Sequence, residues 1–222
     1  MCNGNSNLRI AIDGGAATGK TTVAKLIAKH LNLTYFNTGS MYRLITFFGL
    51  KNNLLGDWKT LINKIANEKI YLKNSNLASS IKFNLIDLDS LEVVNNVSQV
   101  AAIKEIRDFA KTFQVKVGMQ KNVLLEGRDI GTIIMPDADF KFFLKVSPSE
   151  AARRRQEQNL KNNISSSYEE ILKSILMRNE YDSKRKFAPL VPAKDAYIIW
   201  TDKKTPSQIV KEIEDIIYGK KN

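Results

Sequence analysis

The sequence has 222 residues, one cysteine and a formal net charge of +11. A single cysteine excludes an intrachain disulfide and a cysteine-based zinc site. We expect neither a signal peptide nor a membrane-spanning segment, because the first residues are polar and no apolar run approaches the roughly 18 residues that a span needs. A cytoplasmic protein is therefore expected. The lysines are scattered and rarely interleaved with aromatic residues, which favours an anion-binding cleft over a nucleic-acid partner.

The chain begins with a strand, a loop and a helix. Apolar residues alternate over 8–12 and recur at helical spacing over 23–31, which predicts a buried strand and then an amphipathic helix. Between them, residues 14–21 read GGAATGKT and match the phosphate-binding pattern G-x-x-x-x-G-K-[ST]. A glycine-rich turn that fits the pattern by chance is the alternative, and the flanking strand and helix argue against it.

The residue types of this loop suit a nucleoside triphosphate. Gly14 and Gly19 allow backbone angles that a Cβ forbids, so backbone N–H groups can turn toward phosphate oxygens at the positive end of the following helix. Lys20 would reach the β- and γ-phosphates, and the Thr21 hydroxyl would bind Mg²⁺. The predicted ATP-binding residues are Gly14, Gly15, Ala16, Ala17, Thr18, Gly19, Lys20, Thr21 and Thr22.

A second short strand, residues 34–36, leads into a turn rich in polar residues. Ser40 is predicted to cap a helix that begins at Met41. The turn would place Thr38, Tyr42 and Arg43 near the carboxyl end of a strand, where ligands bind in open α/β sheets. A capped turn with one exposed arginine is the alternative.

The middle of the chain changes its periodicity twice. Residues 58–68 predict a helix, and alternating apolar residues over 68–89 predict a small inserted hairpin, with its second strand at 81–85. Helical spacing resumes over 97–117, with Arg107 beside the apolar stripe.

The apolar strand 123–125 runs into a glycine-flanked turn that carries Glu126, Arg128 and Asp129. Charged side chains delivered by a strand end predict the edge of a site. The alternative is an arginine–aspartate pair that only stabilises the loop.

Residues 142–144 predict another strand, and Ser147–Glu150 has the capping-box pattern of a helix start. Residues 159–167 are polar and predict a mobile loop, after which Ser167 and Glu170 cap the next helix.

If that helix is unbroken, Arg178, Asp182 and Arg185 share its inward face. They would then line a cleft, or else form surface ion pairs. Residues 197–200 predict a last strand, and a helix capped from Thr205 follows it. Strands and helices alternate through most of the chain, which predicts an α/β fold with a central parallel sheet flanked by helices in a single domain, residues 1–222.

Arginines from separate regions are all expected near the phosphate-binding loop: Arg43, Arg128, Arg178 and Arg185. A phosphoryl acceptor that itself carries a phosphate needs such fixed cations, and arginine forks suit phosphate oxygens. A mobile loop that closes over the site would exclude water. The residues alone therefore predict a small-molecule phosphotransferase.

Several stretches together make the chain similar to the bacterial cytidylate kinases, of the nucleoside monophosphate kinase group, over nearly its whole length. These are IAIDGGAATGKTT, NTGSMYR, VSQVAAIKEIR, EGRDIGT, PDAD, the Arg178/Asp182/Arg185 spacing and APLVPAKDA. The resemblance implies transfer of the γ-phosphate of ATP to CMP or dCMP with Mg²⁺, by a monomer, in pyrimidine metabolism. It also implies a P-loop kinase fold with an inserted monophosphate-binding subdomain near 68–90 and a mobile lid near 153–168.

The same resemblance implies individual roles. The residues that would line the CMP site are Thr38, Tyr42 and Arg43. Those that would read the cytosine ring are Ser98, Arg107 and Asp129. Those that would join Arg43 on the phosphates are Arg128 and Arg185, and those that would hold the sugar are Arg178 and Asp182. The implied catalytic residues are Lys20, Arg128, Arg178 and Arg185.

Two positions depart from the family's pattern. Asn37 and Glu126 stand where the family usually has aspartate, which leaves the metal site open. Two other functions remain as alternatives: a related kinase for UMP, AMP or shikimate, and a P-loop regulatory or RNA-binding protein that only hydrolyses or senses ATP.

Overall fold

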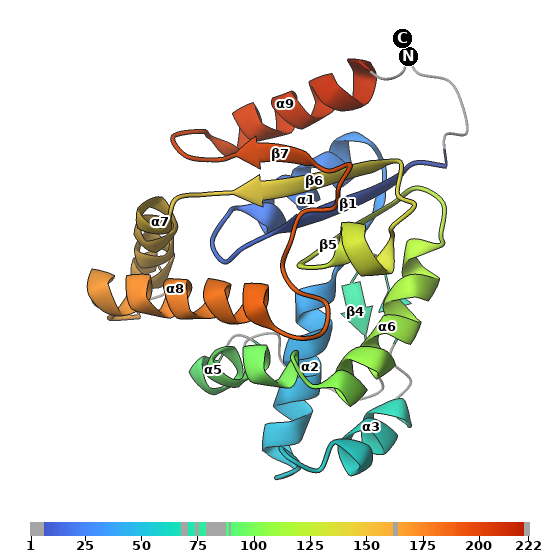
Figure 1. The fold of residues 1–222 in the computed structure, drawn as a ribbon, viewed down its shortest axis with the longest axis vertical. Coiled ribbons are helices and arrows are strands. Elements are labelled where there is room, and N and C mark those ends of the chain that lie inside the picture. The colour runs from blue at the N-terminus through green and yellow to red at the C-terminus, as the bar shows by residue number, and fades with distance from the viewer. Residues whose placement is uncertain are drawn as a thin grey trace.

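A five-stranded parallel sheet forms the centre of the computed structural model, which describes residues 7–67, 71–73, 76–78, 88, 90–161 and 164–219. The strand order is β2-β5-β1-β6-β7, and helices cover the sheet (Figure 1). The strands are β1 (Arg9–Gly14), β2 (Thr34–Asn37), β5 (Val123–Gly127), β6 (Phe140–Lys145) and β7 (Tyr197–Trp200). The parallel α/β sheet predicted from the alternation of elements is confirmed.

The helices follow the strands in the predicted alternation. They are α1 (Lys20–His30), α2 (Thr38–Lys51), α3 (Trp58–Ala66), α5 (Leu91–Val100), α6 (Lys104–Gly118), α7 (Pro148–Lys161), α8 (Tyr168–Lys184) and α9 (Pro206–Gly219), with one π-helix, η1 (Ile130–Ile134). None of the helices in the described ranges is long and apolar enough to cross a membrane.

Alternate side chains of β1 build the core on both faces of the sheet. Ile10 and Ile12 pack in a cluster with residues of α1 and α9, whereas Ala11 faces the opposite cluster with Phe36 and Val117. Burial of each isoleucine contributes about 1.5–3 kcal/mol. The period-two pattern in the sequence therefore specifies which helices lie on which side.

The carboxyl ends of the strands meet at one edge of the sheet. In the registers, Asp13 lies opposite Gly127 and Asn37 lies opposite Glu126. The phosphate-binding loop after β1 and the charged segment after β5 therefore emerge side by side, as expected for ligand binding in a parallel sheet.

A second apolar cluster joins α2, α3, α5 and α6 beyond this edge. The insert begins with an antiparallel hairpin of β3 (Tyr71–Lys73) and β4 (Asn76–Ala78). A hairpin is thus present, but β4 begins earlier than the predicted second strand. Residues 81–85, where that strand was expected, lie outside the described residues.

Two predictions about helices were wrong: the residue at which α2 begins, and the continuity of the helix over 97–117. Helix α2 begins at Thr38 rather than Met41, because the Asn37 side chain caps it by accepting a hydrogen bond from Ser40 N (3.1 Å). The predicted helix over 97–117 is two helices, and the break after α5 leaves the carbonyl of Ala101 free to accept from Arg107 Nη1 (2.9 Å).

Three other local predictions also needed correction. Arg185 does not lie on the helix face with Arg178 and Asp182, since α8 ends at Lys184 and Arg185 has an extended ψ of 142°. Residues 159–161, predicted as loop, are the last turn of α7. The glycine-flanked turn expected over 126–131 is shorter, because β5 continues to Gly127 and the π-helix η1 begins at Ile130.

Candidate active site

The phosphate-binding loop has the geometry that its glycines require. A Cβ on Gly14 would lie 2.4 Å from the Leu144 carbonyl oxygen, and Gly19 caps α1 with a φ of +86°. Lys20 folds onto the loop, where its Nζ donates to Gly15 O (2.6 Å) and Thr18 Oγ1 (3.2 Å). Burial, and then the nearby guanidinium of Arg128, lower the pKa of Lys20.

A cavity of about 160 Å³ opens beside this loop, at the carboxyl edge of the sheet. It receives residues from the loop, α2, α5, α6, the end of β5, α7 and α8. Every residue expected at the acceptor site lines it: Thr38, Tyr42, Arg43, Ser98, Arg107, Arg128, Asp129, Arg178, Asp182 and Arg185. Of the predicted ATP-binding residues, those that line it are Ala16, Ala17, Lys20 and Thr21.

Charges of alternating sign run along the cavity wall. Arg107 Nη2 donates to Asp129 Oδ2, and Arg128 Nε donates to Asp182 Oδ2 (3.0 Å). Arg185 lies between the two carboxylates, 3.6 Å from Asp129 and 3.7 Å from Asp182. These ion pairs hold guanidinium groups in fixed positions, as recognition of an anionic ligand requires.

The cavity nevertheless carries an excess of positive charge, with seven cationic side chains against three carboxylates. Arg178 shows the consequence most clearly, because its buried Nε has no hydrogen-bond partner. Burial, and then repulsion from Arg128, lower the pKa of Arg178 to about 10. A bound phosphate would relieve both the unmet hydrogen bond and the repulsion.

Tyr42, Arg107 and Ser98 line another part of the cavity. The Arg107 guanidinium lies 5.4 Å from the centroid of the Tyr42 ring, and its second nitrogen is held by the Ala101 carbonyl. Ser98 lines the same cavity. A planar ring with both donors and acceptors would find both kinds of group here.

Thr21 and Glu126 are the residues best placed to hold a divalent cation. Thr21 Oγ1 donates to Glu126 Oε1 (2.8 Å), and the buried Glu126 Oε2 has no hydrogen-bond partner. Within the described ranges, no group of three or more His, Cys, Asp or Glu side chains could hold a metal ion. A hydroxyl beside an unpaired carboxylate oxygen suits a hydrated Mg²⁺, which takes few protein ligands.

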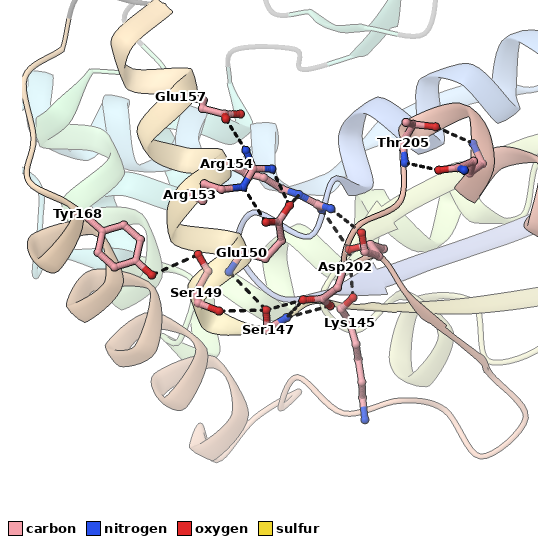
Figure 2. A network of polar contacts seen from close by, with 12 residues as sticks. Lys145, Ser147, Ser149, Glu150, Arg153, Arg154, Glu157, Tyr168, Asp202 and Thr205 are labelled. Atoms are coloured by element: carbon pink, nitrogen blue, oxygen red, sulfur yellow. Dashed lines mark hydrogen bonds and ion pairs between the residues drawn. The ribbon is translucent and has the colours of Figure 1, made fainter.

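A larger cavity, of about 680 Å³, also borders the loop. Its lining includes Gly19 and Thr22 of the predicted ATP-binding set, together with α7 and the 203–206 segment. Arg154 ties these parts together by donating to Glu150 Oε1 (2.8 Å) and Thr201 Oγ1 (3.1 Å), within the polar network of Figure 2. Gly14, Gly15 and Thr18 line neither cavity and shape the loop instead.

The structure adds residues to the site that the sequence analysis did not select. Arg155 of α7 lines the first cavity. Asn179 Oδ1 accepts from Ala16 N (3.0 Å), which fastens α8 to the phosphate-binding loop. Asp13 is buried and accepts from Ile130 N (2.9 Å) and Gly131 N (2.8 Å). An aspartate directly after the apolar residues 10–12 of a buried strand was a signal that could have drawn attention to Asp13.

A family model for cytidylate kinase matches residues 10–218. The chain belongs to the cytidylate kinase family. A curated cytidylate kinase of Clostridioides difficile is 42% identical over 208 residues, covering 93% of this chain and 96% of that protein. The cytidylate kinase of Fusobacterium nucleatum is 42% identical over 221 residues, covering 95% and 99% of the two chains. The resemblance read from the motifs is thus confirmed.

Among solved structures, a shikimate kinase from Bacteroides thetaiotaomicron aligns with a TM-score of 0.51 and 17% identity, covering 95% of this chain and 98% of that one. At this identity the likeness shows that the cytidylate kinase family member shares a fold with that kinase, and nothing more.

Proposed function

We propose that the protein transfers the γ-phosphoryl group of ATP to CMP or dCMP and releases ADP with CDP or dCDP. The observation that carries this proposal is the cavity that joins the phosphate-binding loop to the Arg107–Asp129–Arg185–Asp182–Arg128 ion pairs. Membership of the cytidylate kinase family supports it independently.

The proposed reaction depends on fixed positive charge. The catalytic residues would be Lys20, Arg128, Arg178 and Arg185. They stabilise the charge that spreads over the oxygens of the transferred group, so no covalent enzyme intermediate is needed. The acceptor phosphate would meet Arg43 and Arg128, and the sugar would meet Arg178 and Asp182, in the cavity that all of them line.

The base of CMP would lie at the Tyr42 side of the cavity. There Arg107, Asp129 and Ser98 would face the amino group and N3 acceptor that distinguish cytosine from uracil. Asp129 accepts hydrogen bonds and Arg107 donates them, so the two side chains match that pattern.

ATP would place its phosphates on residues 14–22 and its base in the larger cavity between α7 and the 203–206 segment. Mg²⁺, held by Thr21 with Glu126, would neutralise charge on the β- and γ-phosphate oxygens. Closure of a lid near 153–168 would exclude water. We propose further that the chain works as a monomeric single domain, with the insert near 68–90 on its acceptor side.

The test is a coupled ADP-release assay with ATP and Mg²⁺ that offers CMP, dCMP, UMP, AMP and shikimate in parallel. Strong turnover with CMP and dCMP, and weak turnover with the others, is expected. Preference for UMP, AMP or shikimate would mean that this compound, and not CMP, is the phosphoryl acceptor. ATP hydrolysis without any acceptor dependence, together with tight RNA binding, would favour the regulatory alternative.

A further inference from the structure

Strand β2 lies next to the predicted metal site. Tyr35 lies two residues before Asn37, so both side chains share one face of β2, and Asn37 is in register with Glu126. The Tyr35 hydroxyl donates to Glu126 Oε1 (2.6 Å). This contact links a residue outside the cavity lining to a carboxylate inside it.

The two oxygens of Glu126 have different surroundings. Oε1 accepts from both the Tyr35 and the Thr21 hydroxyls, whereas Oε2 is buried without a hydrogen-bond partner. With Glu126 only 2% exposed, water outside the cavity does not replace the missing partner. A buried anionic oxygen left in this state is costly unless a cation or its hydration shell meets it.

The Tyr35 hydroxyl is suited to act as a permanent donor. A phenol hydroxyl carries one proton that it can donate, and here Glu126 Oε1 is its acceptor. Thr21 uses its proton to donate to Oε1, so its oxygen keeps both lone pairs for a metal ion.

We propose that Tyr35 is a positioning residue for the metal: it fixes the Glu126 carboxylate so that Oε2 and the Thr21 hydroxyl together receive Mg²⁺ on the nucleotide. Tyr35 itself touches neither metal nor substrate and acts through Glu126. The inference rests on the proposed function for the identity of the ligand, a magnesium complex of an adenine nucleotide. Residues that orient a metal ligand in this way typically change metal affinity by 10- to 100-fold when removed.

The test measures the affinity of the full chain for ADP by titration calorimetry, once in EDTA and once in saturating Mg²⁺. The ratio of the two dissociation constants is the metal-dependent gain in affinity. Tyr35→Phe is expected to reduce this gain about tenfold and to leave the affinity in EDTA unchanged. Tyr218→Phe, which removes an exposed hydroxyl on α9, is the matched control and should keep the wild-type ratio.

A double-mutant cycle separates positioning from general stabilisation. Glu126→Gln should reduce the metal-dependent gain at least as much as Tyr35→Phe, and combining the two should cause no further loss. A wild-type gain in Tyr35→Phe, with or without a lower melting temperature, would overturn the proposal, as would fully additive losses. Absence of CMP turnover in the wild type, with the metal-dependent effect of Tyr35 intact, would overturn the proposed function and leave this inference standing.

Discussion

At the scale of single residues, the distinguishing feature of the site is that two of its arginines have buried nitrogen atoms without hydrogen-bond partners. Arg178 Nε and Arg185 Nη2 are buried without a hydrogen-bond partner, although Arg185 lies near the carboxylates of Asp129 and Asp182. Such groups are costly in the folded protein. A bound anion would recover this cost, and under the proposed function the transition state, with charge spread across its oxygens, would recover it most fully.

Replacement of Arg185 by alanine is expected to lower kcat by about 100-fold or more and to change the affinity for ATP little. The reason is that Arg185 pairs with Asp129 and Asp182, which belong to the proposed acceptor site, and is not one of the proposed ATP-binding residues 14–22. Steady-state kinetics and ATP titration check this. Arg9→Ala, at the start of β1 on the opposite edge of the sheet, is the control. An unchanged kcat would remove Arg185 from the mechanism.

Replacement of Arg107 by methionine is expected to narrow the preference for CMP over UMP, measured as the ratio of kcat/KM values, by about tenfold. The variant keeps much of the side-chain volume against Tyr42 but removes the donor paired with Asp129. The melting temperature should also fall, because a buried carboxylate loses a partner. If stability falls but the CMP/UMP ratio is retained, Arg107 has no role in reading the base.

At the scale of elements, the segment after β5 is held by its neighbour strand. Asp13 of β1 accepts from the backbone N–H groups of Ile130 and Gly131 at the start of η1. The π-helix begins directly after Asp129, so the same two hydrogen bonds set where that carboxylate and Arg128 point. The Asp13 side chain of β1 therefore positions the charged residues that follow the neighbouring strand β5.

This arrangement predicts a pH dependence of stability. Burial, the largest cause, raises the pKa of Asp13 from 3.8 to about 6 in the folded protein. Between these values the folded state holds a proton that the unfolded state has released, so the contribution of Asp13 to stability decreases as the pH rises from about 4 to about 6. The decrease amounts to about 3 kcal/mol at most, since one pKa unit corresponds to about 1.4 kcal/mol.

The check is urea unfolding of the wild type and Asp13→Asn from about pH 4 to about pH 7. The difference in unfolding free energy between the two proteins isolates the titration of residue 13. Wild-type stability relative to the variant should decrease as the pH rises. A constant difference would mean that the pKa of Asp13 is not raised in the folded state.

At the scale of the whole molecule, both cavities depend on segments far apart in the sequence. Helices α7 and α8 pack on the phosphate-binding loop through a small cluster of Ala16, Ala151, Ala152, Ile171 and Ile175. The network around Arg154 then joins α7 to the segment after β7 (Figure 2). Because these contacts bridge the sheet and the helices beyond it, we propose that the chain unfolds as one unit.

Scanning calorimetry should therefore give one unfolding transition for the full chain. Addition of CMP together with MgADP should raise the midpoint temperature of this single transition without splitting it. A ligand at 100 times its dissociation constant adds about 2.7 kcal/mol to the free energy of unfolding. Two transitions, of which only one responds to ligand, would contradict the single-domain proposal. CMP alone should also raise the midpoint, since the first cavity is lined by seven cationic side chains.

The sequence by itself determined the phosphate-binding loop, the parallel α/β sheet and the set of charged residues that line the first cavity. These follow from local chemistry: a glycine pattern between a strand and a helix, period-two apolar alternation, and polar side chains directly after strands. Helix boundaries were less accurate. The Asn37 cap starts α2 at Thr38, and the extended backbone of Arg185 ends α8 at Lys184.

Only the tertiary structure decided which charges neutralise one another and which remain unpaired. The Asp13 contacts to η1, the Asn179 contact to the loop and the Tyr35 contact to Glu126 join residues 91 to 163 positions apart. No periodicity or local motif encodes such pairs, because they depend on strand order and register rather than on spacing along the chain. The physical reason is that a parallel sheet brings the carboxyl ends of distant strands to one edge, and burial there fixes each polar group's partner.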